Sequence, residues 1–254
     1  MRKLTTEIQG ISIASIRRGL RYGLEEFRQA SHDTTLDVSS RGTPELLTIP
    51  VRALEDFLTD RVVTVLLDVR AYEDGVLPWH ESVALLTLAK LASPSAVLEI
   101  GTYMGFTTRA LAQNLPGAVI HTLDLPLDFK PETDPAPGLP KDDFHLIAHR
   151  GPGREFIGTP EAARIRQHFG DSATWDFSQI TGTTCFFIDG SHTYEYCKLD
   201  SEKCFALCGG KGAFFWHDCD DGHPGVVRFI GEWRKLGRKI VRLRDTALAY
   251  WDNR

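Results

Sequence analysis

Short apolar runs alternate along the chain with longer stretches whose apolar residues recur at helical spacing. Three of the runs close on an aspartate, at Asp124, Asp189 and Asp218. Short apolar runs bounded by turn residues are typical of buried parallel strands, whereas apolar residues three to four positions apart predict helices. The pattern predicts strands over 96–100, 118–125, 183–189 and 212–218, and helices over 79–91, 106–115, 161–167, 193–208 and 225–236.

The end of the chain departs from this alternation. Two apolar stretches, 239–245 and 247–252, are separated by so few residues that they must pair as antiparallel strands. Alternating strands and helices followed by such a hairpin predict an α/β fold. We expect a doubly wound, mostly parallel sheet with one antiparallel edge strand.

The first 75 residues are less regular. Apolar residues between Ile13 and Phe27 fall near helical spacing with arginines among them, which predicts a basic amphipathic helix. Such a helix packs against the core or a second subunit more often than on a membrane, so a homo-oligomer is one of the expected alternatives. A further helix is expected over 51–59. We predict a mainly helical N-terminal extension, 1–75, for substrate or subunit contacts, and a main domain over 76–254.

A long segment between the second and third predicted strands has no periodicity. Residues 126–150 contain five prolines. Loops of this length in compact domains are usually lids over functional sites or disordered insertions. We predict a mobile lid.

Composition narrows the class of protein. The chain has 254 residues, 42% hydrophobic content and a net charge of −5, which is typical of a globular protein and argues against a nucleic-acid partner. No apolar run reaches the length of a membrane span, so no membrane partner is expected. The five cysteines are an odd number without a Cys-x-x-Cys pair, which favours free thiols in a reducing cytoplasm over disulfides or structural zinc.

The most informative local pattern follows the first main strand. Glu99, Gly101 and Gly105 form an acidic-x-Gly-x-x-x-Gly turn between a strand and a helix, and Asp124 closes the next strand 19 positions beyond Gly105. Backbone N–H groups at such a turn bind anionic or polar ligands, and a carboxylate after the neighbouring strand accepts hydrogen bonds from ribose hydroxyls. Similar glycine turns also occur with no ligand, and strand ends often carry a solvated aspartate.

These motifs together resemble those of the class I S-adenosylmethionine-dependent methyltransferases. The resemblance implies a seven-stranded sheet that ends in such a reversed strand. Within that family the chain is most similar to the small-molecule O-methyltransferase branch that includes macrolide-sugar O-methyltransferases and cephalosporin-hydroxylase-like proteins. The resemblance covers about residues 76–254, which it makes an S-adenosylmethionine-binding methyltransferase domain. The matching segments are Leu98-Glu-Ile-Gly-Thr-Tyr-Met-Gly105, Gly170-Asp-Ser172, Phe187-Ile-Asp-Gly-Ser-His-Thr-Tyr-Glu-Tyr196 and Trp216-His-Asp218.

The resemblance implies residue roles. Gly101 and the neighbouring backbone contact the methionine end of S-adenosylmethionine with support from Glu99, and Glu81 reaches the methionine amino group. Asp124 holds the ribose, and Asp171 lies by the adenine. His192 is the general base, although it could instead cap the following helix. The complete set of expected cofactor contacts is Glu81, Glu99, Gly101, Thr102, Tyr103, Gly105, Asp124, Asp171, Ser172 and Asp189.

The resemblance also implies a metal site, with one departure. The related enzymes bind Mg²⁺ through the carboxylate of the fourth strand and two adjacent acidic residues after the fifth, and Asp189 and Asp218 match two of these. The third position is His217, which favours a softer divalent ion. A bound magnesium ion would select an acceptor with two neighbouring oxygens, such as a diol. Alternatively, the two aspartates pair with lysines, and the histidines and acids up to His223 form a solvated loop.

The expected activity is transfer of a methyl group from S-adenosylmethionine to a hydroxylated small molecule of sugar or natural-product type. Methyl transfer needs in-line positioning and a deprotonated acceptor, and histidine is a base suited to neutral pH. One alternative is a non-methylating cofactor-binding partner of a hydroxylase. Another is a nucleotide-dependent oxidoreductase, which is disfavoured because such enzymes prefer Gly-x-Gly-x-x-Gly.

Overall fold

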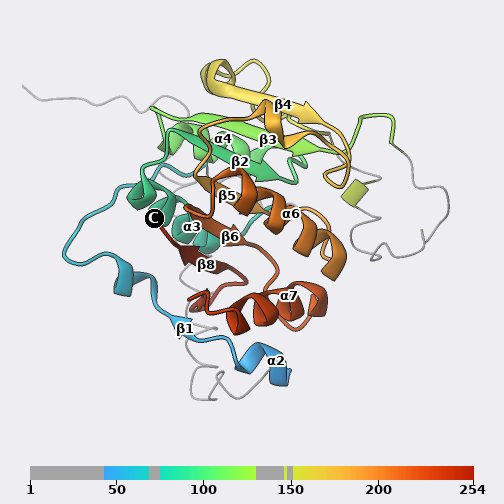
Figure 1. The fold of residues 1–254 in the computed structure, drawn as a ribbon. Coiled ribbons are helices and arrows are strands. Elements are labelled where there is room, and N and C mark those ends of the chain that lie inside the picture. The colour runs from blue at the N-terminus through green and yellow to red at the C-terminus, as the bar shows by residue number, and fades with distance from the viewer. Residues whose placement is uncertain (1–42, 69–74, 130–145, 148–150) are drawn as a thin grey trace, which may run out of the picture. The chain divides into compact units, whose positions relative to one another are not determined.

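A mixed sheet of eight strands organises the computed structural model of this protein (Figure 1). The structure describes residues 43–68, 75–129, 146–147 and 151–254, which belong to one compact unit. The strand order is β1-β7-β8-β6-β5-β2-β3-β4, and every neighbouring pair is parallel except the two that involve β8. Helices cover both faces of the sheet (Figure 1).

The elements follow one another in the order expected for alternating strands and helices. Along the chain they are α2 (Pro44–Leu47), β1 (Val51–Arg52), the 3-10 helix η2 (Leu54–Phe57), α3 (Trp79–Ala92), β2 (Ala96–Ile100), α4 (Phe106–Asn114), β3 (Val119–Asp124), η3 (Pro160–Arg164), β4 (Ile165–Phe169), η4 (Phe177–Gln179), β5 (Cys185–Ile188), α6 (Tyr194–Leu207), β6 (Ala213–Trp216), α7 (Pro224–Lys235), β7 (Val241–Leu243) and β8 (Ala249–Asp252).

Two apolar cores lie on the opposite faces of the sheet, because alternate side chains of a strand point to opposite sides. On β5, Phe187 packs into the core that contains Leu85 of α3 and Leu111 of α4. Phe186 packs on the other side, with Phe229 of α7. All five side chains are almost fully buried, and burying one phenylalanine contributes ~1.5–3 kcal/mol. Burial on both faces explains why the central strands read as continuous apolar runs.

The predicted α/β fold with a doubly wound, mostly parallel sheet is confirmed. Two details differ from the prediction. The sheet has eight strands rather than seven, since the two residues of β1 pair with β7. The reversed strand β8 lies two places inside the sheet, between β6 and β7, and only the short β7 and β1 separate it from the edge.

One predicted helix is wrong. Residues 161–167 were expected to be helical, but the 3-10 helix η3 ends at Arg164 and β4 begins at Ile165. Ile165 is buried in the core beside β3, whereas the rest of β4 is only partly buried. The backbone pairing with β3 therefore decides the conformation here, over a weak local pattern.

The N-terminal region and the loop are described only in part. The predicted helix between Ile13 and Phe27 and most of the 126–150 lid lie outside the described residues, so both stay predictions. Over 51–59 the structure has β1 and η2 in place of a helix. Among the described residues, none of the helices has the length and apolar content needed to cross a membrane. All five cysteines are free thiols, as predicted, and the structure buries four of them.

Candidate functional site

The turn after β2 is built around a buried glutamate. Glu99 is fully buried, and its Oε2 accepts hydrogen bonds from the hydroxyls of Thr108 on α4 and Thr122 on β3. Burial disfavours the charged form and raises the pKa of Glu99 to about 8, against the opposing effect of the two hydroxyls. Within the described part of the chain, its Oε1 has no hydrogen-bond partner. Glu99 is therefore a fully buried acid that joins the turn to α4 and β3 through one oxygen.

Both glycines of this turn have positive φ, at +100° for Gly101 and +90° for Gly105. A Cβ on Gly101 would lie 1.9 Å from the carbonyl oxygen of Asp189, and one on Gly105 would lie 2.7 Å from the ring of Phe156. The end of β5 thus presses against the turn. Packing within the protein therefore requires glycine at both positions, whether or not a ligand binds.

Asp124 closes β3 directly beside this turn. Its Oδ2 accepts a hydrogen bond from the backbone N–H of Tyr103 at 2.8 Å, and its Oδ1 accepts one from Leu125 at 2.7 Å. The hydroxyls of Thr102 and Thr122 meet at 2.6 Å just below. The predicted cofactor residues of the turn and Asp124 are therefore brought together by the parallel pairing of β2 with β3.

Asp171 and Ser172 follow β4, at the outer end of the same sheet edge. The Asp171 carboxylate accepts hydrogen bonds from the N–H of Ala173 at 2.8 Å and from the Tyr196 hydroxyl of α6 at 3.2 Å. Ser172 is buried, and its carbonyl oxygen accepts a hydrogen bond from Lys203. These contacts fix the position of the turn, and the expected contact with adenine stays a prediction.

His217, at the end of β6, lies among three carboxylates. Its Nε2 is 2.8 Å from Oε2 of Glu81, a buried residue in the first turn of α3. Its Nδ1 is 3.1 Å from Oδ1 of Asp189 and 3.0 Å from Oδ2 of Asp218. The second oxygen of Glu81 accepts the backbone N–H of Ala247 at 2.6 Å. Both ring nitrogens of His217 are thus engaged by acids.

The charges in this cluster stabilise one another. Burial disfavours the charged imidazole, but the nearby Asp189 charge and the hydrogen bonds to Asp189, Asp218 and Glu81 raise the pKa of His217 well above its usual value. Burial likewise opposes ionisation of Asp218, but hydrogen bonds from His192 and His217 outweigh it and hold the pKa of that carboxyl well below its usual value. At neutral pH the cluster contains an imidazolium beside ionised Asp218.

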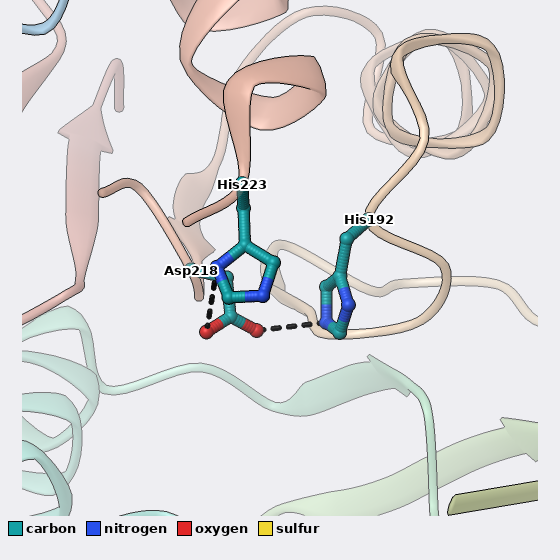
Figure 2. Close-up of side chains that lie close together, drawn as sticks. All are labelled: His192, Asp218 and His223. Carbon is teal, nitrogen blue, oxygen red and sulfur yellow. Dashed lines mark ion pairs between the residues drawn. The ribbon is translucent and has the colours of Figure 1, made fainter. Parts of the chain in front are cut away.

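His192 lies in the loop before α6. Figure 2 shows His192 and His223 each paired with one oxygen of the Asp218 carboxylate, and the centroids of the two rings are 4.6 Å apart. His192 Nε2 is 2.7 Å from Asp218 Oδ2, and His223 Nδ1 is 3.5 Å from the other oxygen. Thr193 caps α6 by accepting the N–H of Tyr196, so the capping role considered for His192 belongs to the next residue.

His223 was only an ambiguous loop residue in the sequence. It precedes Pro224 at the start of α7, and Asp220 bends the chain back so that His223 Nδ1 lies 2.9 Å from Asp220 Oδ1. That hydrogen bond raises the pKa of His223. The Asp-Asp-Gly run before it is a turn signal, but the approach of His223 to Asp218 could not be read from spacing alone.

Among the described residues, two groups of three side chains have potential metal-ligand atoms within 4.8 Å of one another: Asp189 with His217 and Asp218, and His192 with Asp218 and His223. The first is the set predicted from the sequence. Its imidazole nitrogen suits Mg²⁺ poorly, because magnesium prefers oxygen ligands, and suits a softer divalent ion better.

Comparisons with known proteins agree with this geometry. Residues 98–219, which include the glycine turn, Asp189, His192 and Asp218, match a family model described as a methyltransferase domain. The chain contains a methyltransferase domain. The matched residues make up 122 of the chain's 254 residues, a little less than half. No curated protein sequence matches the chain.

Solved structures show the same fold at low sequence identity. A putative O-methyltransferase from Klebsiella pneumoniae is 14% identical with a TM-score of 0.50, over 89% of this chain and 97% of the other. The cofactor-bound protein Rv0187 from MTB is 16% identical with a TM-score of 0.50, over 89% of this chain and 95% of the other. The likeness to these structures extends beyond the residues matched by the family model and concerns the fold alone.

Proposed function

We propose that this methyltransferase transfers the methyl group of S-adenosylmethionine to a hydroxyl of a small molecule of sugar or natural-product type, with His192 as general base. The observation that carries the proposal is the pair formed by His192 Nε2 and Asp218 Oδ2 at 2.7 Å, beside the cofactor turn. A base held by a carboxylate at its other nitrogen is the arrangement that activates hydroxyl groups in many enzymes.

The residues around the turn fit the cofactor. The carbonyl oxygen of Asp189 approaches Gly101, and Asp124 accepts the N–H of Tyr103, so oxygen atoms gather at this part of the sheet edge. The ammonium group of S-adenosylmethionine is a hydrogen-bond donor that such oxygens can accept. Gly101, Thr102, Tyr103 and Gly105 supply the backbone of the turn, and Asp124 lies where the neighbouring strand ends. When bound, the cofactor supplies an electrophilic methyl group.

The chain's own groups then have distinct roles. Asp218 accepts the hydrogen bond of His192 Nε2–H, which leaves Nδ1 as the basic nitrogen of the neutral ring. His192 Nδ1 would take the proton of the acceptor hydroxyl, so that the hydroxyl oxygen can accept the methyl group that the bound cofactor would supply. The turn and the base are carried by neighbouring strands β2, β5 and β6, which fixes their relative position and favours an in-line approach.

The predicted divalent metal is not part of this proposal and stays a prediction, because an imidazole in the third ligand position suits magnesium poorly. Asp189 then contributes through its contact with His217 and through its carbonyl oxygen, which packs against Gly101.

Isothermal titration calorimetry tests the cofactor assignment. The purified chain is expected to bind S-adenosylmethionine and S-adenosylhomocysteine and to give no heat with NAD. A panel of sugars, phenols and other hydroxylated compounds, followed by mass spectrometry for a methyl ether, then identifies the acceptor. Binding of NAD without S-adenosylhomocysteine would contradict the proposal. Cofactor binding with no methylated product across the panel, at all pH values tried, would favour the hydroxylase-partner alternative.

A further inference from the structure

A cavity of about 780 Å³ lies at the edge of the sheet opposite to the cofactor turn. The parallel strands have their carboxyl ends at one edge, which carries Gly101, Asp189 and Asp218, and their amino ends at the other. The cavity reaches Asp252 of β8, which pairs with Ala213 at the amino end of β6. Its volume is within the range of small-molecule pockets, about 300–1,000 Å³. The cavity is therefore a candidate ligand site that the proposed methyl transfer does not use.

Four parts of the chain form the walls of this cavity. They are the C-terminal half of α3, the segment from β1 to residue 61, the loop between α7 and β7, and the end of β8. The apolar side chains that line it include Phe57, Leu88, Leu91 and Tyr250. The rings of Phe57 and Tyr250 pack edge to face with centroids 5.4 Å apart, so this wall is both flat and fixed. Such a wall accommodates the apolar body of a ligand.

The charged side chains of the cavity are mostly basic. Among the described residues that line it, the basic ones are Arg52, Arg61, Arg234, Arg238 and Lys239, and the acidic one is Asp252. Asp56 pairs with Arg52, and Arg254 pairs with Asp252. The other four basic side chains form no salt bridge within the described part of the chain. In a protein with a net charge of −5, the cavity is thus a local excess of positive charge.

We propose that this basic cavity binds a small organic anion, with a phosphate or carboxylate group on a flat apolar body. The site is separate from that of the proposed methyl transfer, and the inference does not depend on that function. The basic side chains contact the anionic group, and the aromatic and leucine side chains contact the apolar body. A small molecule fits this site better than an acidic protein does, because the cavity is concave and has aromatic walls.

Arg238 is the side chain best suited to hold the anionic group. Its guanidinium carbon lies 4.1 Å from the ring centroid of Trp233 and 4.9 Å from that of Phe205. Stacking on two rings holds the planar guanidinium in one orientation. Its Nε is buried and has no hydrogen-bond partner among the described residues. Burial also lowers the pKa of Arg238 from its usual value, an effect that an anion in the cavity would offset.

The backbone before Arg61 is strained. Thr59 and Asp60 have φ angles of +39° and +60°, in a region that residues with a Cβ rarely adopt. This pair follows η2, and both Thr59 and Arg61 line the cavity. Strained backbone of this kind is concentrated at ligand-binding and catalytic sites, which agrees with a ligand site here.

Binding of matched naphthyl compounds to the full chain tests the proposal. The protein is saturated with S-adenosylhomocysteine, and naphthyl phosphate, naphthoate, naphthol and inorganic phosphate are then titrated separately in a calorimeter. At least one of the two naphthyl anions is expected to bind saturably, about tenfold or more tightly than naphthol or inorganic phosphate. The tighter of the two anions identifies the preferred acidic group. Equal binding of naphthol or of inorganic phosphate, or no saturable binding of either naphthyl anion, would overturn the proposal.

Substitutions in the cavity locate the bound anion. Arg238→Gln should weaken binding about tenfold or more, because it removes a charged donor from a partly buried position. If that variant fails to fold, the double change Arg61→Gln with Lys239→Gln replaces it, since both side chains are exposed, and should weaken binding about threefold to tenfold. Arg228→Gln is the matched control, because Arg228 is exposed on α7 outside the cavity, and should keep wild-type affinity. Wild-type affinity in the cavity variants would place the anion elsewhere and overturn the proposal.

Discussion

Two regions at the same edge of the sheet differ in how they treat a buried carboxyl group. One is the turn after β2, and the other is the cluster of Glu81, Asp189, His217 and Asp218 around the ends of β5 and β6. In the turn, buried Glu99 contacts neutral threonine hydroxyls, and its pKa is raised to about 8. In the cluster, Asp218 contacts three histidines, and its pKa is lowered, mainly by hydrogen bonds from His192 and His217 that outweigh burial. The same kind of side chain is therefore an acid kept neutral in one region and a fixed anion in the other. The difference lies in the partners, since both carboxyls are largely buried.

The two regions also constrain the backbone differently. The turn depends on the absence of a side chain at Gly101, where the carbonyl oxygen of Asp189 approaches. The cluster depends on side chains that meet from distant parts of the chain, such as Glu81 and His217. Substitutions should therefore affect folding most in the turn and catalysis most in the cluster.

The largest effect is expected from Gly101→Ala. A Cβ 1.9 Å from the Asp189 carbonyl oxygen, at a φ of +100°, must displace β5 or the turn, and the free energy of unfolding should fall by about 3 kcal/mol or more. Urea denaturation measures the loss, and S-adenosylhomocysteine calorimetry should show no binding. Gly117→Ala is the control, because a Cβ there meets nothing within 4 Å. Equal stability of the two variants would refute the packing argument.

Next is His192→Ala, which removes the proposed base. Turnover should fall by about 10²–10⁴, the usual contribution of a positioned general base, while cofactor affinity changes little. The measurement is methyl-ether formation with the acceptor found in the panel, under conditions where chemistry limits the rate. His80→Ala serves as the control, since His80 is exposed on α3. Unaltered turnover in His192→Ala would remove the base assignment.

A pH effect is expected from Glu99. The unfolded chain releases this proton near pH 4.5, whereas the folded protein keeps it to about pH 8, so stability falls as pH rises between those values. Glu99 alone should lower the free energy of unfolding by about 2 kcal/mol between pH 6 and pH 8. In urea denaturation, Glu99→Gln should lack the part of the decline that comes from Glu99. Glu202→Gln, on the surface of α6, is the control and should keep it. Parallel curves for wild type and Glu99→Gln would contradict the buried neutral acid.

The smallest effect is expected from His223→Asn. His223 Nδ1 is 3.5 Å from Asp218, compared with 2.7 Å for His192, and it bonds mainly to half-exposed Asp220. Exposed pairs of this kind contribute about 0–1 kcal/mol, so turnover should fall less than about tenfold. Steady-state rates of His223→Asn and His192→Ala, compared side by side, test this ranking. A loss as large as that of His192→Ala would mean that the two histidines act as one unit.

Much of the fold could be predicted because burial on both faces leaves a strong signal. The strand over 96–100 and the helix before it match β2 and α3 closely. β4 was missed because only Ile165 is buried on a strand near the sheet edge, which leaves little alternation to detect. β1 was missed because it is two residues long and exposed, so that only its pairing with β7 defines it.

Sequence motifs predicted which residues lie at this edge of the sheet, but not which of their side chains contact one another. Gly101, Asp124 and His192 were identified from motifs and do lie at one edge of the sheet. The contact of Glu81 with His217 joins residues 136 positions apart, and no spacing rule relates them. The sequence also assigned Gly101 to the ligand, whereas the structure shows that the end of β5 already requires a glycine at that position.

The short segment that carries α2 and β1 affects how the protein should be shortened for experiments. Leu46 and Ile49 are buried in the core beside α7, and the N–H of Thr43 bonds to Asp221, in the loop that carries the site. A chain that starts at residue 76 would expose that apolar surface, leave the edge of β7 unpaired and free the loop, all of which favour aggregation. A chain that starts at residue 42 keeps these contacts and is the better choice for crystallisation or spectroscopy.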